Sequence, residues 1–112
     1  MAKGFGGMSG GMFGDMRKQA ESMQKRLADL QTDLKQRVYE ASAGGGMVTV
    51  HVNGHREVLA IKISPEVVDP KDVEMLEDLV TAAVSLAIKK AGDAYAEEMS
   101  KITGGLSLPG IL

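Results

Sequence analysis

The stretch "GGGMVTVHVNGHREVLAIKI", residues 44–63, decides the fold because it has the alternating pattern of two paired β-strands. Valine occupies every second position of "MVTVHV", and "EVLAIKI" places leucine and isoleucine at the same period. Side chains of a strand alternate between its two faces, so this period gathers the apolar residues on one face. An isolated hairpin is at best marginally stable in water. The hairpin therefore needs apolar partners from the rest of the chain.

The register of the hairpin depends on the length of its loop. The Asn-Gly dipeptide at 53–54 is typical of a two-residue turn, but that turn would place Val50 opposite Glu57. A four-residue loop over 53–56 places Val50 opposite Leu59 instead. Cross-strand apolar pairs stabilise a sheet, so we predict the four-residue loop.

A third strand is predicted immediately before the hairpin. The segment "RVYEASA", residues 37–43, contains the strand-favouring pair Val38 and Tyr39, and three glycines at 44–46 supply a turn. Together these segments predict a three-stranded antiparallel meander with one apolar face.

A long helix is predicted before the sheet, over residues 15–36, with Asp15 as its N-cap. Its apolar residues recur at alternating spacings of four and three, with no Gly or Pro between them, and form a narrow stripe. The stripe consists of Met16, Ala20, Met23, Leu27, Leu30 and Leu34. Such a stripe suits packing against another helix as well as against a sheet.

A second long helix is predicted after the sheet. Asp69 suits its N-cap and Pro70 its first position, and the helix runs to about Lys101 before two glycines end it. Its middle, "LVTAAVSLAI" over 79–88, is apolar almost all round, so it needs burial on several sides. A second copy of the chain is the simplest partner, as an isologous homodimer. We predict an interface made of Leu27, Leu30, Leu34, Leu79, Val80, Ala83, Val84 and Ala87.

These elements predict an α+β fold. Residues 15–103 form a single α-β-β-β-α domain, preceded by a flexible Gly/Met-rich arm over 1–14 and followed by a flexible tail over 104–112. The arm holds six glycines, which lose the most backbone entropy on ordering.

Composition and the absence of known motifs limit the classes of function that we expect for this chain. The chain has no cysteine, no signal-peptide pattern and no apolar run near the ~20 residues of a membrane span, so we expect a cytoplasmic protein with no membrane contact. The glycines at 44–46 lack the pattern of a phosphate-binding loop. His51 and His55 do not share a helix turn, and no serine has an evident His–Asp pair. We expect no enzymatic activity, metal, cofactor or small-molecule substrate.

Charge is distributed unevenly along the chain, although the net charge is only −2. Residues 1–38 hold seven basic and four acidic side chains, and residues 39–112 hold six basic and eleven acidic ones. Lys18 and Lys25 share one helical face, about 10 Å apart along the axis at ~1.5 Å per residue. A row of exposed cations on a rigid helix suits DNA phosphates, although many ordinary helix surfaces look the same. The predicted DNA-binding residues are Arg17, Lys18, Lys25, Arg26, Lys89, Lys90 and Lys101.

The layout resembles the YbaB/EbfC family of bacterial nucleoid-associated proteins. The similarity lies in the Gly/Met-rich start, in "MRKQAESMQKRLADLQTDL", in "ASAGGGMVTVHVNGHREVLAIKISPEVV", and in "DVEMLEDLVTAAVSLAIKKAGDAYAEEMSKITGGL". The last segment is the most specific. The resemblance implies an intertwined homodimer, helices projecting from a central sheet, and DNA binding that alters DNA conformation. It implies no enzymatic activity and no cofactor.

The sequence therefore favours a nucleoid-associated protein that binds double-stranded DNA as a homodimer, mainly through backbone contacts. The alternative is a structural protein–protein interaction module that does not bind DNA directly.

Overall fold

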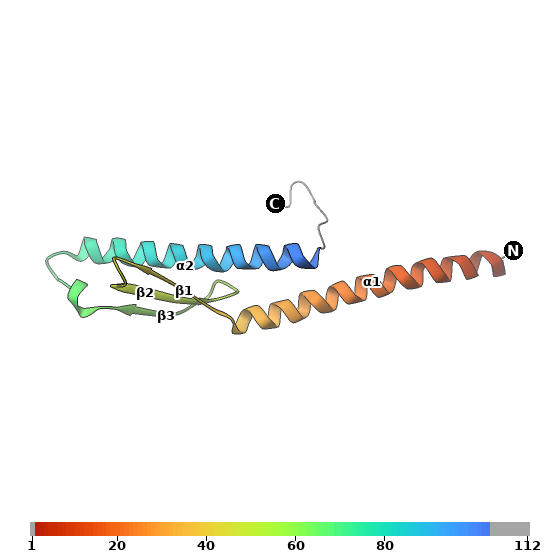
Figure 1. Cartoon of the computed structure of the whole chain (residues 1–112), viewed down its shortest axis with the longest axis horizontal. Coiled ribbons are helices and arrows are strands. Elements are labelled where there is room, and N and C mark those ends of the chain that lie inside the picture. The colour runs from red at the N-terminus through yellow and green to blue at the C-terminus, as the bar shows by residue number, and fades with distance from the viewer. Residues whose placement is uncertain (1, 104–112) are drawn as a thin grey trace.

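The computed structural model describes residues 2–103, and the predicted tail over 104–112 lies outside this range. The elements in chain order are α1 (Ala2–Gln36), β1 (Val38–Ala43), β2 (Val48–Asn53), β3 (Val58–Ile63), the short 3-10 helix η1 (Pro65–Val67) and α2 (Val73–Ile102). The strands form one antiparallel sheet in the order β1-β2-β3. The predicted α+β fold and meander are confirmed. Helix α2 lies along the sheet, whereas α1 projects well beyond it (Figure 1).

The core lies between α2 and the middle strand. Val48, Val50 and Val52 on β2 are fully buried, and so are three alanines at every fourth position of α2: Ala83, Ala87 and Ala91. This spacing places the alanines on one stripe of the helix. Their small side chains allow the helix backbone to approach the sheet closely.

The other face of the sheet is polar. Glu40 and His51 form a cross-strand hydrogen bond at 2.9 Å, and the hydroxyls of Ser42 and Thr49 form another at 2.9 Å. The sheet therefore has one core face and one solvent face, as expected for an antiparallel sheet that carries helix on one side.

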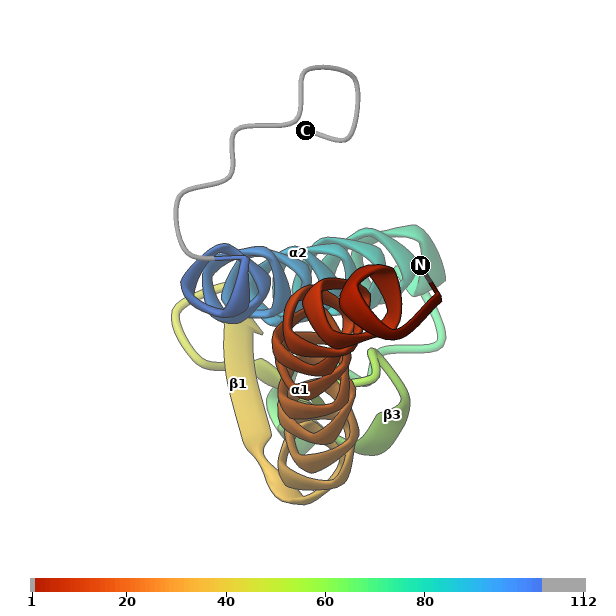
Figure 2. The same cartoon turned by 90° about the vertical axis from the view of Figure 1, so that its right-hand side faces the viewer.

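Strand β3 is not covered by α2. Ile61 pairs with Val50 and Ile63 pairs with Val48, so both isoleucines lie on the core face of the sheet. They are nevertheless 43% and 40% exposed, because α2 packs on β1 and β2. One half of the core face is thus open within a single chain. Figure 2 shows β1 and β3 on either side of α1, with α2 above them.

The predicted hairpin register is wrong. Val50 pairs with Ile61 and not with Leu59, because the ladder shifts between His51 and Val52 and leaves Leu59 as an extra residue on β3. Such a bulge cannot be inferred from alternation alone. The shift is by two residues, so the apolar side chains stay on the predicted face.

The predicted helix starts also differ from the structure. Helix α2 begins at Val73, with Asp72 as the cap that accepts a hydrogen bond from the Met75 amide at 3.2 Å. Asp69 instead accepts from the Lys71 amide at 2.9 Å and shapes the preceding turn. Helix α1 begins at Ala2, so Asp15 lies inside the helix and is not a cap. The flexibility of residues 1–14 stays a prediction.

Val50→Ala should lower the free energy of unfolding by about 2 kcal/mol, because it removes two methyl groups from a fully buried site and leaves a cavity. Val38→Ala is the matched control, since Val38 is 57% exposed and should lose about 0.5 kcal/mol or less. Urea unfolding of both variants measures the difference. Equal losses would contradict the placement of the core.

Candidate nucleic-acid interface

Four of the predicted DNA-binding residues lie on the projecting part of α1. Arg17, Lys18, Lys25 and Arg26 are all exposed. None of them forms a salt bridge with another residue in the described part of the chain. At 3.6 residues per turn, Lys18 and Lys25 lie on the side of α1 opposite to its apolar stripe, and the two arginines flank them. The structure therefore places these four cations on one exposed segment of α1.

The apolar stripe of α1 is covered only at its C-terminal end. Leu34 is fully buried and Leu30 is 7% exposed, whereas Met16 and Met23 are 59% and 39% exposed. The cationic part of α1 therefore stands clear of the chain's own sheet (Figure 1).

The three predicted lysines of α2 are already engaged. Lys89 pairs with Asp93 at 3.0 Å, and Lys101 pairs with Glu98 at 3.4 Å. Lys90 donates to the backbone carbonyl of Glu40 at 3.1 Å. The carboxylates of Asp93 and Glu98 offset the charges of Lys89 and Lys101, so these two lysines present less positive charge than the four cations of α1, which form no salt bridge in the described chain.

Arg37 joins the base of α1 to α2, a role that the sequence did not reveal. Its guanidinium pairs with Asp33 on α1 and, at 3.4 Å, with Glu98 on α2. Hydrogen bonds with Tyr39, Asp33 and Glu98 raise the pKa of Arg37 above its usual value. The hydrogen bond from Arg37 in turn lowers the pKa of Glu98. Only the fold brings these residues together, since Arg37 and Glu98 are 61 positions apart.

The predicted dimer-interface residues fall into two groups. Leu30, Leu34, Ala83 and Ala87 are buried inside the single chain, so they have almost no surface to offer a second copy in this conformation. The other four are only partly buried: Leu27, Leu79, Val80 and Val84. The sequence could not separate these two groups. An apolar side chain indicates that a residue is buried, but it does not indicate whether the same chain or a second chain covers it.

An open apolar strip runs between α2 and β3. Lys90 and Leu86 lie on the flank of α2 beside β1, since both line a hollow with residues of β1. By helical periodicity, Val84 and Ile88 face the opposite flank, toward β3. Ile88 is 36% exposed and adjoins the open face that carries Ile61. Neither isoleucine is among the residues that the sequence predicted for a dimer interface.

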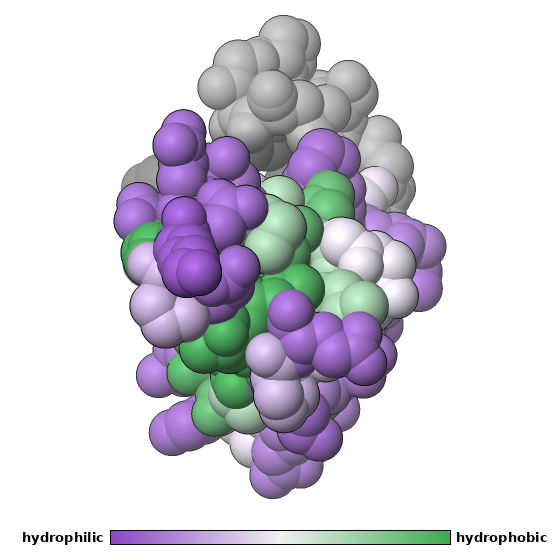
Figure 3. Space-filling view, turned by 90° about the vertical axis from the view of Figure 1, so that its left-hand side faces the viewer, coloured by the Kyte–Doolittle hydropathy of each residue, from purple (hydrophilic) through white to green (hydrophobic). Residues whose placement is uncertain are grey.

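Apolar surface continues around the end of the molecule where α2 begins. Figure 3 shows a band of apolar side chains at this end, bordered by polar ones. The exposed apolar residues of β3, η1 and the start of α2 include Ile63, Val68, Val73 and Met75. Contiguous exposed apolar surface commonly marks an interaction site.

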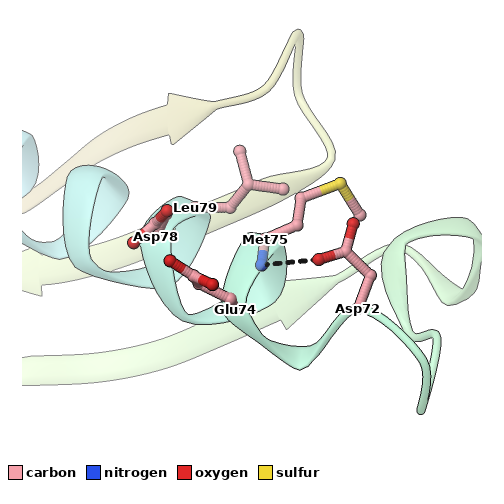
Figure 4. Close-up of a pocket in the computed structure, with 5 residues that line it drawn as sticks. All are labelled: Asp72, Glu74, Met75, Asp78 and Leu79. Atoms are coloured by element: carbon pink, nitrogen blue, oxygen red, sulfur yellow. Dashed lines mark hydrogen bonds between the residues drawn. The ribbon is translucent and has the colours of Figure 1, made fainter.

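A hollow of about 310 Å³ at the start of α2 is acidic. Asp72, Glu74 and Asp78 line it with Met75 and Leu79, and Asp72 is occupied in capping the helix (Figure 4). All five side chains come from the first turns of one helix and its cap, so no second element closes the hollow. Its three carboxylates repel phosphate and make it unsuitable for nucleic acid.

The described residues contain no group of three or more His, Cys, Asp or Glu side chains placed to hold a metal ion. None of their helices combines the length and apolar character that a membrane crossing requires.

Comparisons with known proteins identify the family of the chain. The profile of the YbaB/EbfC DNA-binding family matches residues 9–106. The chain belongs to this family. A nucleoid-associated protein of Clostridium novyi is 51% identical over 109 residues, covering 96% of each chain. One from Thermoanaerobacter pseudethanolicus is 51% identical over 112 residues, covering 99% of each.

The fold also occurs in a solved structure. The crystal structure of an uncharacterized protein of Helicobacter pylori matches with a TM-score of 0.73 at 22% identity. The match covers 82% of this chain and 97% of that one. The α-β-β-β-α arrangement is therefore shared at low sequence identity.

Glu98→Gln should destabilise the chain at neutral pH, with a deficit that shrinks on acidification. The folded-state pKa of Glu98 lies below its unfolded value, so its ionised form stabilises the fold above the unfolded pKa. That contribution is lost as the pH falls through the folded pKa. Thermal unfolding of parent and variant between about pH 7 and about pH 3 measures the deficit. Glu97→Gln is the neighbouring control, and an equal effect there would contradict the role of the Arg37 pair.

Proposed function

We propose that the protein is a nucleoid-associated, cytoplasmic protein that binds duplex DNA as a homodimer and alters its conformation. The observation that carries this proposal is the set of four exposed cations on α1, none of which forms a salt bridge within the described part of the chain. The family and the names of its relatives support DNA as the ligand.

Contacts with the DNA backbone account best for this surface. Lysine and arginine on a straight helix reach phosphates without reading bases, and they release counterions on binding. A dimer presents eight such cations. If half of them neutralise phosphates, the log–log salt slope is about −3 to −4, at ~0.9 per contact.

Lys18→Glu combined with Lys25→Glu should weaken duplex binding by about tenfold or more, whatever the probe sequence, because it removes phosphate contacts and adds repulsion. Titrations at several salt concentrations measure affinity and slope together. Lys62→Glu combined with Lys71→Glu is the matched control, since it makes the same charge change on exposed residues outside α1. Equal binding by the α1 variant and the parent would exclude α1 as the contact surface.

The open half of the sheet supports the homodimer. Exposed apolar side chains follow β3 beside the partly covered flank of α2, namely Val58, Leu59, Ile61, Ile63 and Ile88. A second copy covers this strip in an isologous interface, which is the commonest arrangement of soluble oligomers. The interface then uses Val80 and Val84 from the original prediction and adds the residues of β3.

Ile61→Glu should convert the dimer into a monomer that keeps its fold, because Ile61 is already 43% exposed within one chain. Gel filtration with light scattering should give twice the chain mass of 11.9 kDa for the parent and one chain mass for the variant. Lys62→Glu, on the opposite face of the same strand, should stay dimeric. A monomeric parent at micromolar concentration would contradict the dimer.

The same apolar strip also favours a second candidate function, an interaction module that binds another protein and not DNA. A folded dimer that does not shift duplex DNA even at low salt would support this alternative.

A further inference from the structure

The loop between β2 and β3 holds the last turns of α1. The Gly54 amide donates to the carbonyl of Leu34 at 2.8 Å. The Nε2 atom of His55 donates to the carbonyl of Gln31 at 2.8 Å. The Leu34 carbonyl also accepts from the Arg37 amide at 3.2 Å, so the Gly54 contact adds a second, shorter hydrogen bond from the loop to the end of α1.

Only glycine allows this approach at position 54. A Cβ there would lie 2.6 Å from the carbonyl oxygen of Leu34 and 2.7 Å from its Cβ. Both are closer than real Cβ contacts, and the first neighbour is backbone. The loop and the helix end therefore touch directly, with no side chain between them.

The loop has a fixed shape of its own. Asn53 is 3% exposed, and its Oδ1 accepts from the amides of His55 at 2.9 Å and Glu57 at 3.0 Å. Its Nδ2 donates to the carboxylate of Glu57 at 2.8 Å. These bonds fix His55 relative to the sheet, so its bond to α1 transmits the orientation of the sheet to the helix.

The length of α1 amplifies any movement at this point. Lys18 is 16 residues before Leu34, which is about 24 Å at ~1.5 Å per residue. A tilt of about 10° at the base would therefore move Lys18 by about 4 Å, more than the length of a hydrogen bond. Small changes in the loop become large changes in where the cations lie.

We propose that the β2–β3 loop sets the direction of α1, with Gly54 and His55 as positioning residues that place the cationic row on the duplex. The role of this loop in DNA binding rests on the proposed function. Its role in directing α1 does not, and a measurement without DNA tests it separately.

The test replaces His55 and measures the direction of α1 directly. His55→Leu removes the donor at similar size, and His55→Gln restores an amide donor. His51→Leu is the matched control, because His51 bonds to Glu40 on the sheet and not to α1. The chain has no cysteine, so spin labels can be placed at Gln19 on α1 and Glu77 on α2. Labelled chains are diluted with unlabelled ones, so that each dimer carries at most one labelled pair.

We expect His55→Leu to broaden or shift the distance between the labels without DNA, and His55→Gln and His51→Leu to keep the parent distribution. Duplex affinity should fall about tenfold in His55→Leu alone, with a salt slope reduced by about one contact, ~0.9, or more. Thermal stability and dimer mass should change little, because a single exposed hydrogen bond contributes modestly to stability.

Each other outcome overturns a defined part of the proposal. An unchanged distance in His55→Leu overturns the loop as the element that directs α1. A changed distance with parental affinity overturns its role in placing the cations. A parent that binds no duplex overturns the proposed function, while the distances still decide whether the loop directs α1.

Discussion

The close packing of three alanines of α2 on the valines of β2 determines the rest of the structure. Because Ala83, Ala87 and Ala91 are small, the helix lies low over β1 and β2. An α-helix is about 10 Å wide and neighbouring strands are about 4.8 Å apart, so one helix centred on two strands leaves the third uncovered. The open β3 half is thus a consequence of how α2 is placed. It gives the chain an apolar surface that a second copy can cover.

The same arrangement separates α1 from the core. Since α2 takes the covered part of the sheet, the buried side chains of α1 among those that the structure describes are Leu30 and Leu34 at its base, where the β2–β3 loop also bonds to it. Arg37 adds an ionic link from that base to Glu98. A helix held at one end acts as a lever, so its direction depends on the few contacts at that end. The buried core and the exposed cations of α1 therefore lie in different parts of the chain, so substitutions of the cations should have little effect on stability.

The element order and the apolar face of the sheet could be predicted because alternation and helical periodicity are local properties of the sequence. The register could not, because the bulge at Leu59 changes the pairing without changing which face is apolar. The sequence favours Asp69 as the cap of α2 because Pro70 suits the first position of a helix, and only the folded backbone shows that Asp72 accepts from the Met75 amide. Half of the residues predicted for the interface, for example Ala83 and Ala87, are buried within the single chain. Apolar periodicity alone does not show which chain covers a residue.

Acidic and basic side chains are also concentrated in different parts of the molecule. Residues 64–78, at the start of α2, hold six acidic side chains and one lysine, whereas the exposed row on α1 is cationic. These two regions lie toward opposite ends of the long axis (Figure 1). A polyanion is therefore attracted to one end and repelled from the other, which orients the protein before contact. Because the net charge is only −2, this orientation comes from the separation of charge and not from its total. A binding surface for DNA can thus exist on an acidic protein, provided that the cations stand on an element that projects away from the acidic body.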